Sequence, residues 1–141
     1  MIAIDTNILV YAFHRGFPLH SQAKARVAGL AEGALPWALP IFCVGEFLRV
    51  VTHPRICAPP ASPEEAVRAI DALVASPTLH LLSPGDRYWL LLRDAVAEAK
   101  ARGNLVFDAQ IAALCREHGV SELLSEDRDF ARFDGLRITT L

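Results

Sequence analysis

Cysteine and long apolar runs are both scarce in this chain. The three cysteines are Cys43, Cys57 and Cys115, and no two of them are separated by only two residues. This number and spacing exclude a disulfide framework and a cysteine-based zinc site, so we expect three small buried thiols in a reducing compartment. No stretch approaches the roughly 20 apolar residues that a membrane span needs, and the first residues lack the pattern of a signal peptide. We therefore expect a cytoplasmic protein that makes no use of a membrane.

Charge is also limited, and its two signs nearly cancel. The 141 residues include 14 basic and 16 acidic side chains, which give a formal net charge of −2. This balance argues against a general nucleic-acid coat, because non-specific phosphate binding needs a basic excess. A local basic patch is still compatible with it, since 12 of the 14 basic residues are arginine. The length, the 52% hydrophobic content and the absence of repeats predict one domain over residues 1–141.

Short apolar segments alternate with helical patterns along the chain. Strands are predicted at residues 1–4, 37–39, 78–82, 122–125 and 136–140. Helices are predicted at residues 6–13, 21–31, 41–52, 64–76, 86–102 and 105–118. Buried strands separated by helices indicate an α/β protein, built as a three-layer α/β/α sandwich around a mostly parallel central sheet. In such sheets, ligands bind beyond the carboxyl ends of the strands.

Four acidic residues fall where this fold would bring them together. Asp5 directly follows the first predicted strand, and Asp127 follows the strand that contains the sequence ELLS. Glu46 and Asp108 lie on apolar faces of two predicted helices, so their side chains are expected to point inward. An inward-facing aspartate in the middle of a helix has poor helix propensity and is costly to bury. These positions suggest a shared role.

Each acid also has a simpler interpretation. Asp5 has the position of an N-cap for the helix that follows it, and Glu46 has the spacing to pair with Arg49. Asp127 and Asp129 fit ordinary turn residues. A bound divalent cation would explain all of them together. Without one, two carboxylates about 5 Å apart would repel by roughly 3 kcal/mol at an effective dielectric constant near 20.

The chemistry of the cluster favours Mg²⁺ or Mn²⁺ over Zn²⁺, because its ligands are oxygens without histidine or cysteine. Such an ion can make a bound water more acidic and stabilise the leaving oxygen of a phosphodiester. Thr6, Asn7 and Ser125 are predicted to orient the carboxylates, or alternatively to cap local structure. Other phosphotransfer classes fit poorly: a haloacid-dehalogenase-like phosphatase needs a second aspartate where Asn7 stands. A response-regulator receiver needs a lysine after a late strand, and the only lysines are Lys24 and Lys100.

The motifs resemble those of PIN-domain proteins, and in particular the VapC toxins of bacterial type II toxin–antitoxin modules. The resemblance rests on the runs IDTNILVYA, GEFLRVVTHPRI, NLVFDAQIAAL and LLSEDRDFARF, which follow one another over nearly the whole chain. It implies a single PIN-like domain and an acidic metal site formed by Asp5, Glu46, Asp108 and Asp127, with Asp129 as a further possible ligand. Ser125 stands where the family often has threonine, a change that keeps the hydroxyl group.

The resemblance also implies a function. It predicts a Mg²⁺- or Mn²⁺-dependent endoribonuclease that cuts structured RNA, either transfer or ribosomal RNA, and so inhibits translation. It further predicts that the protein forms a homodimer and binds a VapB-like antitoxin. Operator DNA would be contacted only by the antitoxin. The alternative is a catalytically silent PIN-like module that binds RNA or protein. Arginine matches phosphate geometry, and the candidate RNA contacts are Arg15, Arg49, Arg87, Arg128 and Arg132.

Overall fold

A single parallel sheet forms the centre of the molecule. The computed structural model describes all residues from 1 to 141, and its five strands follow the order β3-β2-β1-β4-β5. The predicted α/β architecture is confirmed, and every neighbouring pair of strands is parallel, so the sheet is wholly and not merely mostly parallel. The strands are β1 (Ile2–Ile4), β2 (Trp37–Pro40), β3 (Leu79–Leu82), β4 (Glu122–Leu124) and β5 (Arg137–Thr139).

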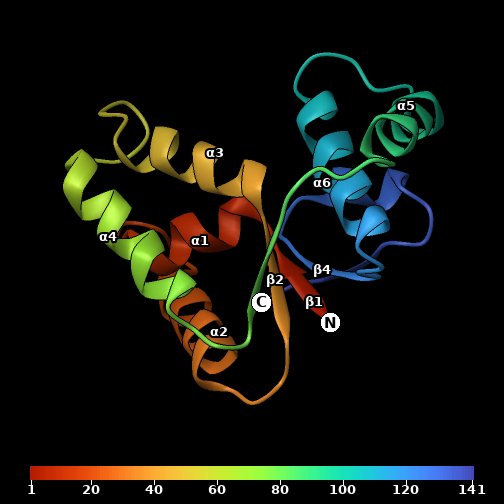
Figure 1. Ribbon diagram of the computed structural model, residues 1–141. Coiled ribbons are helices and arrows are strands. Elements are labelled where there is room, and N and C mark those ends of the chain that lie inside the picture. The colour runs from red at the N-terminus through yellow and green to blue at the C-terminus, as the bar shows by residue number, and fades with distance from the viewer.

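Helices cover both faces of the sheet. They are α1 (Thr6–Phe13), α2 (His20–Glu32), α3 (Ile41–Val51), α4 (Pro63–Val74), α5 (Tyr88–Ala99), α6 (Leu105–Glu117) and the short 3₁₀ helix η1 (Arg128–Arg132). Helices α1 to α4 lie on one side of the sheet, and α5 and α6 lie on the other (Figure 1). The side changes because the chain runs outward from β1 to β3 and then returns through β4 to β5. Right-handed crossovers in opposite directions place their helices on opposite faces.

The ends of the helices follow from local chemistry. The hydroxyl oxygen of Ser62 accepts a hydrogen bond from the backbone N–H of Glu65 at 3.1 Å, and Pro63 occupies the first position of α4. The helix predicted at residues 86–102 is shorter in the structure, because Lys100 adopts a left-handed conformation with φ of 49°. Gly119 has φ of 67° just beyond α6, a conformation that glycine adopts without steric cost.

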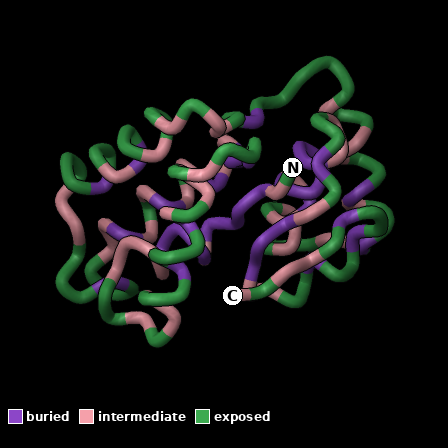
Figure 2. The backbone as a smooth tube through the Cα atoms, turned by 90° about the horizontal axis from the view of Figure 1, so that it is seen from below, coloured by how far each residue is buried: buried purple, intermediate pink, exposed green.

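The core fills the space between the sheet and both helical layers. All four residues of β2 are buried, as is typical of a central strand in a parallel sheet. Figure 2 shows buried residues gathered in the interior of the molecule, where they include most of the central strands β1, β2 and β4, while β5 at one edge of the sheet has no buried residue. The three cysteines are unpaired and buried, as expected. No helix is both long enough and apolar enough to cross a membrane.

The sheet contains a switch point between β1 and β4. These two strands are adjacent, and the backbone N–H of Asp5 donates to the carbonyl oxygen of Leu124 at 3.0 Å where both strands end. The chain leaves β1 toward α1 and leaves β4 toward η1. Connections that leave neighbouring strands in different directions open a crevice at the carboxyl edge of a sheet. The predicted acidic residues lie around this crevice.

Candidate metal centre

Asp5 is the most deeply buried of the acids, with 5% of its surface exposed. Its Oδ1 accepts a hydrogen bond from the backbone N–H of Thr6 at 2.7 Å, which makes Asp5 the N-cap of α1. Its Oδ2 accepts from Asn7 Nδ2 at 2.8 Å and from the hydroxyl of Ser125 at 2.7 Å. Asp5 therefore caps the helix and lies at the crevice, so the two interpretations of this residue are compatible.

Ser125 connects the segment after β4 to the segment after β1. It is fully buried, and its Oγ accepts hydrogen bonds from Asn7 Nδ2 at 3.1 Å and from the backbone N–H of Asp127 at 3.0 Å. The side-chain oxygen of Asn7 also accepts from the backbone N–H of Glu126 at 3.4 Å. This network fixes the position of Asp127 relative to Asp5. Polar groups that orient carboxylates in this way commonly support metal sites.

Glu46 lies at the rim of the crevice. Its Oε2 accepts a hydrogen bond from the hydroxyl of Thr6 at 2.8 Å, and its Oε1 lies 3.7 Å from Arg49 Nη2. The expectation of an inward side chain is only partly right, because 38% of the Glu46 side chain is exposed. The pairing with Arg49 is present as well. A hydrogen bond to α1 and an ion pair within α3 thus hold this carboxylate from two sides.

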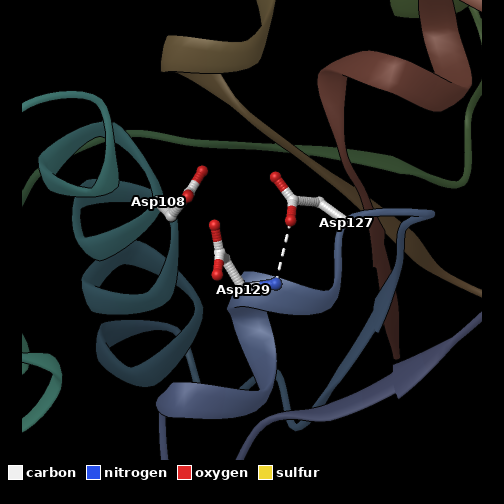
Figure 3. Close-up of side chains that lie close together, drawn as sticks. All are labelled: Asp108, Asp127 and Asp129. Atoms are coloured by element: carbon white, nitrogen blue, oxygen red, sulfur yellow. Dashed lines mark hydrogen bonds between the residues drawn. The ribbon is translucent and has the colours of Figure 1, made fainter.

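Three aspartates form the tightest acidic group in the structure. One carboxylate oxygen from each of Asp108, Asp127 and Asp129 lies within 4.8 Å of the others, and Figure 3 shows the three side chains converging. Asp127 is the N-cap of η1, and its Oδ1 accepts a hydrogen bond from the backbone N–H of Asp129 at 2.8 Å. Asp129 is exposed and also pairs with Arg132 at 3.3 Å. The turn interpretation of Asp127 and Asp129 is therefore correct, and both residues also face Asp108.

Asp108 does not lie in the middle of a helix, contrary to the prediction. Asp108 lies in the first turn of α6, where the helix dipole favours a carboxylate and where helix propensity imposes little cost. Its side chain is half-buried rather than fully inward. What remains unusual about Asp108 is its surroundings, which contain several other carboxylates.

Four of the predicted acids line one cavity. It encloses about 270 Å³ and is bordered by Asp5, Glu46, Asp108 and Asp127. A neighbouring cavity of about 240 Å³ is bordered by Glu46, Asp108, Asp127 and Asp129. The structure thus brings all five carboxylates to one region, from the segments that follow β1 and β4 and from helices α3 and α6. An all-oxygen donor set of this kind fits a hard divalent cation.

Burial and mutual repulsion make two of these carboxyls unusually weak acids. The pKa of Asp5 is raised to about 6, mainly by burial and further by the negative charges of Glu46 and Asp127. The hydrogen bonds from Ser125 and Thr6 lower this pKa but do not cancel the increase. Burial also raises the pKa of Asp108 to about 7, and the charges of Asp127, Asp5 and other acids add to this effect. Near neutral pH, the site therefore favours the binding of a proton or of a cation.

Two residues of this region have no counterpart in the sequence-based prediction. Tyr11 lines the cavity with the acids, and its pKa is raised by burial and by the charges of Glu126, Asp5 and Asp127. The signal for Tyr11 was its position four residues after Asn7, on the same face of α1. Glu126 accepts a hydrogen bond from the backbone N–H of Leu141 at 2.7 Å. Nothing in the acidic run SEDRD distinguishes Glu126 from its neighbours.

The five candidate arginines are dispersed. Arg49 borders the acidic cavity, Arg132 pairs with Asp129, and Arg128 begins η1 directly after Asp127. Arg15 is exposed in the segment after α1. Arg87 is not brought to the site, because its backbone N–H is bonded to Glu117 at 2.9 Å, at the opposite end of α6 from Asp108. Contact of any of these residues with RNA remains a prediction.

Residues 2–136 match the PIN domain family. The chain belongs to the PIN-domain family. Two relatives of this PIN domain in Mycobacterium tuberculosis are ribonuclease VapC43 and ribonuclease VapC48, each 39% identical to it. The alignment with VapC43 covers 97% of this chain and 92% of VapC43. The alignment with VapC48 covers 95% of this chain and 92% of VapC48. The predicted resemblance to VapC ribonucleases is thereby confirmed.

Solved structures show the same fold. VapBC2 from Rickettsia felis, bound to a DNA fragment from their promoter, matches with a TM-score of 0.72 and 18% identity over 99% of this PIN domain and 98% of that chain. VapC20 from Mycobacterium tuberculosis, a sarcin–ricin loop cleaving toxin, matches with a TM-score of 0.69 and 19% identity over 97% and 99%. FitAB bound to a DNA fragment matches with a TM-score of 0.65 and 16% identity, over 99% of this chain and 94% of the FitAB chain. At these identities the likeness concerns the fold.

Proposed function

We propose that this PIN domain is a divalent-metal-dependent endoribonuclease that acts as the toxin of a toxin–antitoxin pair. The observation that carries the proposal is the cavity bordered by four carboxylates from distant parts of the chain. Such a concentration of negative charge is unfavourable in a small domain unless a cation or protons neutralise it. The relatives named ribonuclease VapC support the choice of RNA as the substrate.

The acids supply the ligands for Mg²⁺ or Mn²⁺. Asp108, Asp127 and Asp129 have oxygens within 4.8 Å of one another, and Asp5 and Glu46 border the adjoining space. When bound, such an ion stabilises the charge that develops on a phosphodiester and makes water a better nucleophile. We assign catalytic and metal-binding roles to Asp5, Glu46, Asp108 and Asp127. Asp129 is the most exposed of the cluster in Figure 3 and serves as an additional ligand.

The neighbouring polar residues orient these carboxylates. Ser125 and Asn7 hold Oδ2 of Asp5, and the Thr6 hydroxyl holds Oε2 of Glu46. The backbone N–H of Thr6 holds Oδ1 of Asp5, and Arg49 lies beside Oε1 of Glu46, so both oxygens of each carboxylate are held in place. Preorganised charge of this kind lowers the reorganisation needed during phosphodiester hydrolysis.

The substrate we propose is structured RNA, either transfer or ribosomal RNA. One solved relative of the same fold is described as cleaving the sarcin–ricin loop. A net charge of −2 gives this chain little general attraction for RNA, so recognition must depend on local contacts. Arg49, Arg128 and Arg132 lie next to the acids and are the nearest candidates for phosphate contacts.

We propose a VapB-like antitoxin as the protein partner and a homodimer as the assembly. The solved neighbours include VapBC and FitAB complexes, several of them bound to DNA. Contact with operator DNA would then be made by the antitoxin, which agrees with the acidic net charge of this chain. The proposed location is the cytoplasm, where RNA and antitoxin are both accessible.

Sequencing of RNA ends after brief induction in a bacterial host tests this function. We expect new ends at one or a few positions in transfer or ribosomal RNA with the wild-type chain. Asp5→Asn should abolish them, and Asp94→Asn should not, because Asp94 is an exposed carboxylate on α5 that pairs only with its neighbour Arg93. Identical ends with wild type and Asp5→Asn would contradict the proposal.

A further inference from the structure

A second pocket lies between α3 and α6, beside the acidic cavity. It encloses about 270 Å³, and its walls include Phe42 and Gly45 of α3 and Phe107 and Gln110 of α6. Phe107 is 56% exposed, which is unusual for a phenylalanine. Phe42 is backed by the ring of Tyr88, with ring centroids 5.9 Å apart. We call this space the aromatic pocket.

The aromatic pocket is continuous with the metal centre. Glu46, Arg49 and Phe107 border both the aromatic pocket and the acidic cavity that contains Asp108 and Asp129. Phe107 also directly precedes Asp108 in the chain. A molecule whose reacting group lies among the acids would therefore place its adjoining part at the aromatic pocket.

We propose that the aromatic pocket binds one unpaired base of the RNA substrate next to the phosphate that is cut, with Arg49 contacting a flanking phosphate. This inference rests on the proposed ribonuclease function and names the feature of RNA that the site recognises. Single-stranded RNA is typically bound by stacking of bases on aromatic side chains and by hydrogen bonds to base edges. Phe107 and Phe42 offer the apolar walls, and the Gln110 amide offers both a donor and an acceptor.

Size and charge favour a base over a protein segment. Sites for drug-sized molecules enclose about 300–1,000 Å³, so a pocket of about 270 Å³ suits a single ring system. Arg49 places a guanidinium at the border between this pocket and a group of carboxylates. A cation at that border complements the phosphate that follows a bound base.

Two glycines allow a closely matched test. Gly45 and Gly29 are both exposed helical residues, and a Cβ atom added at either would meet no heavy atom within 4 Å. Leucine is a better helix former than glycine, so Gly45→Leu and Gly29→Leu should both fold. Only Gly45 borders the aromatic pocket, so only Gly45→Leu extends a side chain into it.

The experiment titrates the four nucleoside 5′-monophosphates into each protein and follows the side-chain amide of Gln110 by NMR. We expect at least one nucleotide to shift this signal in wild type and in Gly29→Leu, and none to do so in Gly45→Leu. Phe107→Ala should weaken that binding about 5- to 150-fold, the range that corresponds to loss of one base-stacking contact. In RNA cleavage, Gly45→Leu should raise KM with little change in kcat.

The outcomes separate this inference from the proposed function. RNA cleavage by wild type, with Gly45→Leu behaving like Gly29→Leu in both assays, would overturn the base site and leave the ribonuclease intact. Nucleotide binding that Gly45→Leu abolishes, without any RNA cleavage by wild type, would support the base site and contradict the ribonuclease. If Gly45→Leu disrupted self-association or antitoxin binding and left nucleotide titrations unchanged, the pocket would be a protein contact and the inference would be wrong.

Discussion

The hydroxyl oxygen of Ser125 lies 2.7 Å from Oδ2 of Asp5 and 3.0 Å from the backbone nitrogen of Asp127. The buried side chain of Ser125 thus connects the segments that follow β1 and β4. Asp5 and Ser125 are 120 residues apart in the sequence. The distance between two of the proposed metal ligands depends on this link. It connects the topology of the sheet to the chemistry of the site.

Ser125→Ala should therefore weaken both stability and activity. The substitution removes a donor to Asp5 and leaves the N–H of Asp127 without its partner, which should lower the free energy of unfolding by about 1–3 kcal/mol. Urea denaturation measures this change, and RNA cleavage should fall about 10-fold or more. Ser76→Ala is the matched control, because the Ser76 hydroxyl donates to the carbonyl oxygen of Ala31 far from the acids. Wild-type cleavage by Ser125→Ala would show that the link has no functional role.

The metal-free protein should lose stability as the pH rises from about 4 to about 7. The pKa values of Asp5 and Asp108 are raised from 3.8 to about 6 and about 7, so the folded state binds more protons than the unfolded state across this interval. By linkage, the free energy of unfolding then falls with increasing pH. Thermal unfolding in a chelator at a series of pH values measures the slope.

Asp108→Asn separates this effect from other titrations. Asp108 makes no hydrogen bond that opposes its raised pKa, so the amide relieves the repulsion by the other carboxylates and loses only the smaller attraction of a carboxylate to the N-terminus of α6. In a chelator at pH 7.5, this variant should melt at a higher temperature than wild type, and the difference should vanish near pH 4. A variant that melts below wild type at pH 7.5 would contradict the repulsion argument.

Mg²⁺ or Mn²⁺ should raise the melting temperature of wild type at pH 7.5. A ligand at 100 times its dissociation constant stabilises the folded state by about 2.7 kcal/mol. Asp127→Asn should reduce the shift, whereas Asp94→Asn should preserve it, because Asp94 is exposed on α5 away from the cavity. Equal shifts in both variants would mean that the cation binds elsewhere.

Thr6→Val should affect the metal more than the fold. Valine keeps the shape of the buried threonine but removes the hydroxyl that donates to Glu46 at 2.8 Å. Glu46 is partly exposed and retains Arg49, so stability should change by less than about 1 kcal/mol. The metal concentration that gives half-maximal RNA cleavage should rise about 10-fold. An unchanged metal dependence would remove Thr6 from the supporting network.

The sequence predicted the fold well because its signals are local. Alternation of buried strands and helices defined the layers, and Ser62 and Gly119 marked helix ends by their cap chemistry. Asp5 and Asp127 were predicted at strand ends, and the carboxyl edge of a parallel sheet brings such residues together. These inferences needed no knowledge of distances.

Other features depend on how the elements pack. Asp129 lies close to Asp108 because η1 turns the chain there and because α6 packs beside it. The sequence contains no periodic pattern that predicts this short 3₁₀ helix. The aromatic pocket likewise requires the relative placement of α3 and α6. The exposure of Glu46 and the remote position of Arg87 are also tertiary results, which spacing along the chain does not determine.

The most direct test of the account is a crystal structure of the protein soaked in Mn²⁺, with anomalous diffraction used to locate the ion. We expect an anomalous peak in the space bordered by Asp5, Glu46, Asp108 and Asp127, within coordination distance of at least two of these carboxylates. A fully occupied ion elsewhere, with no peak among these residues at a saturating Mn²⁺ concentration and neutral pH, would contradict the central claim.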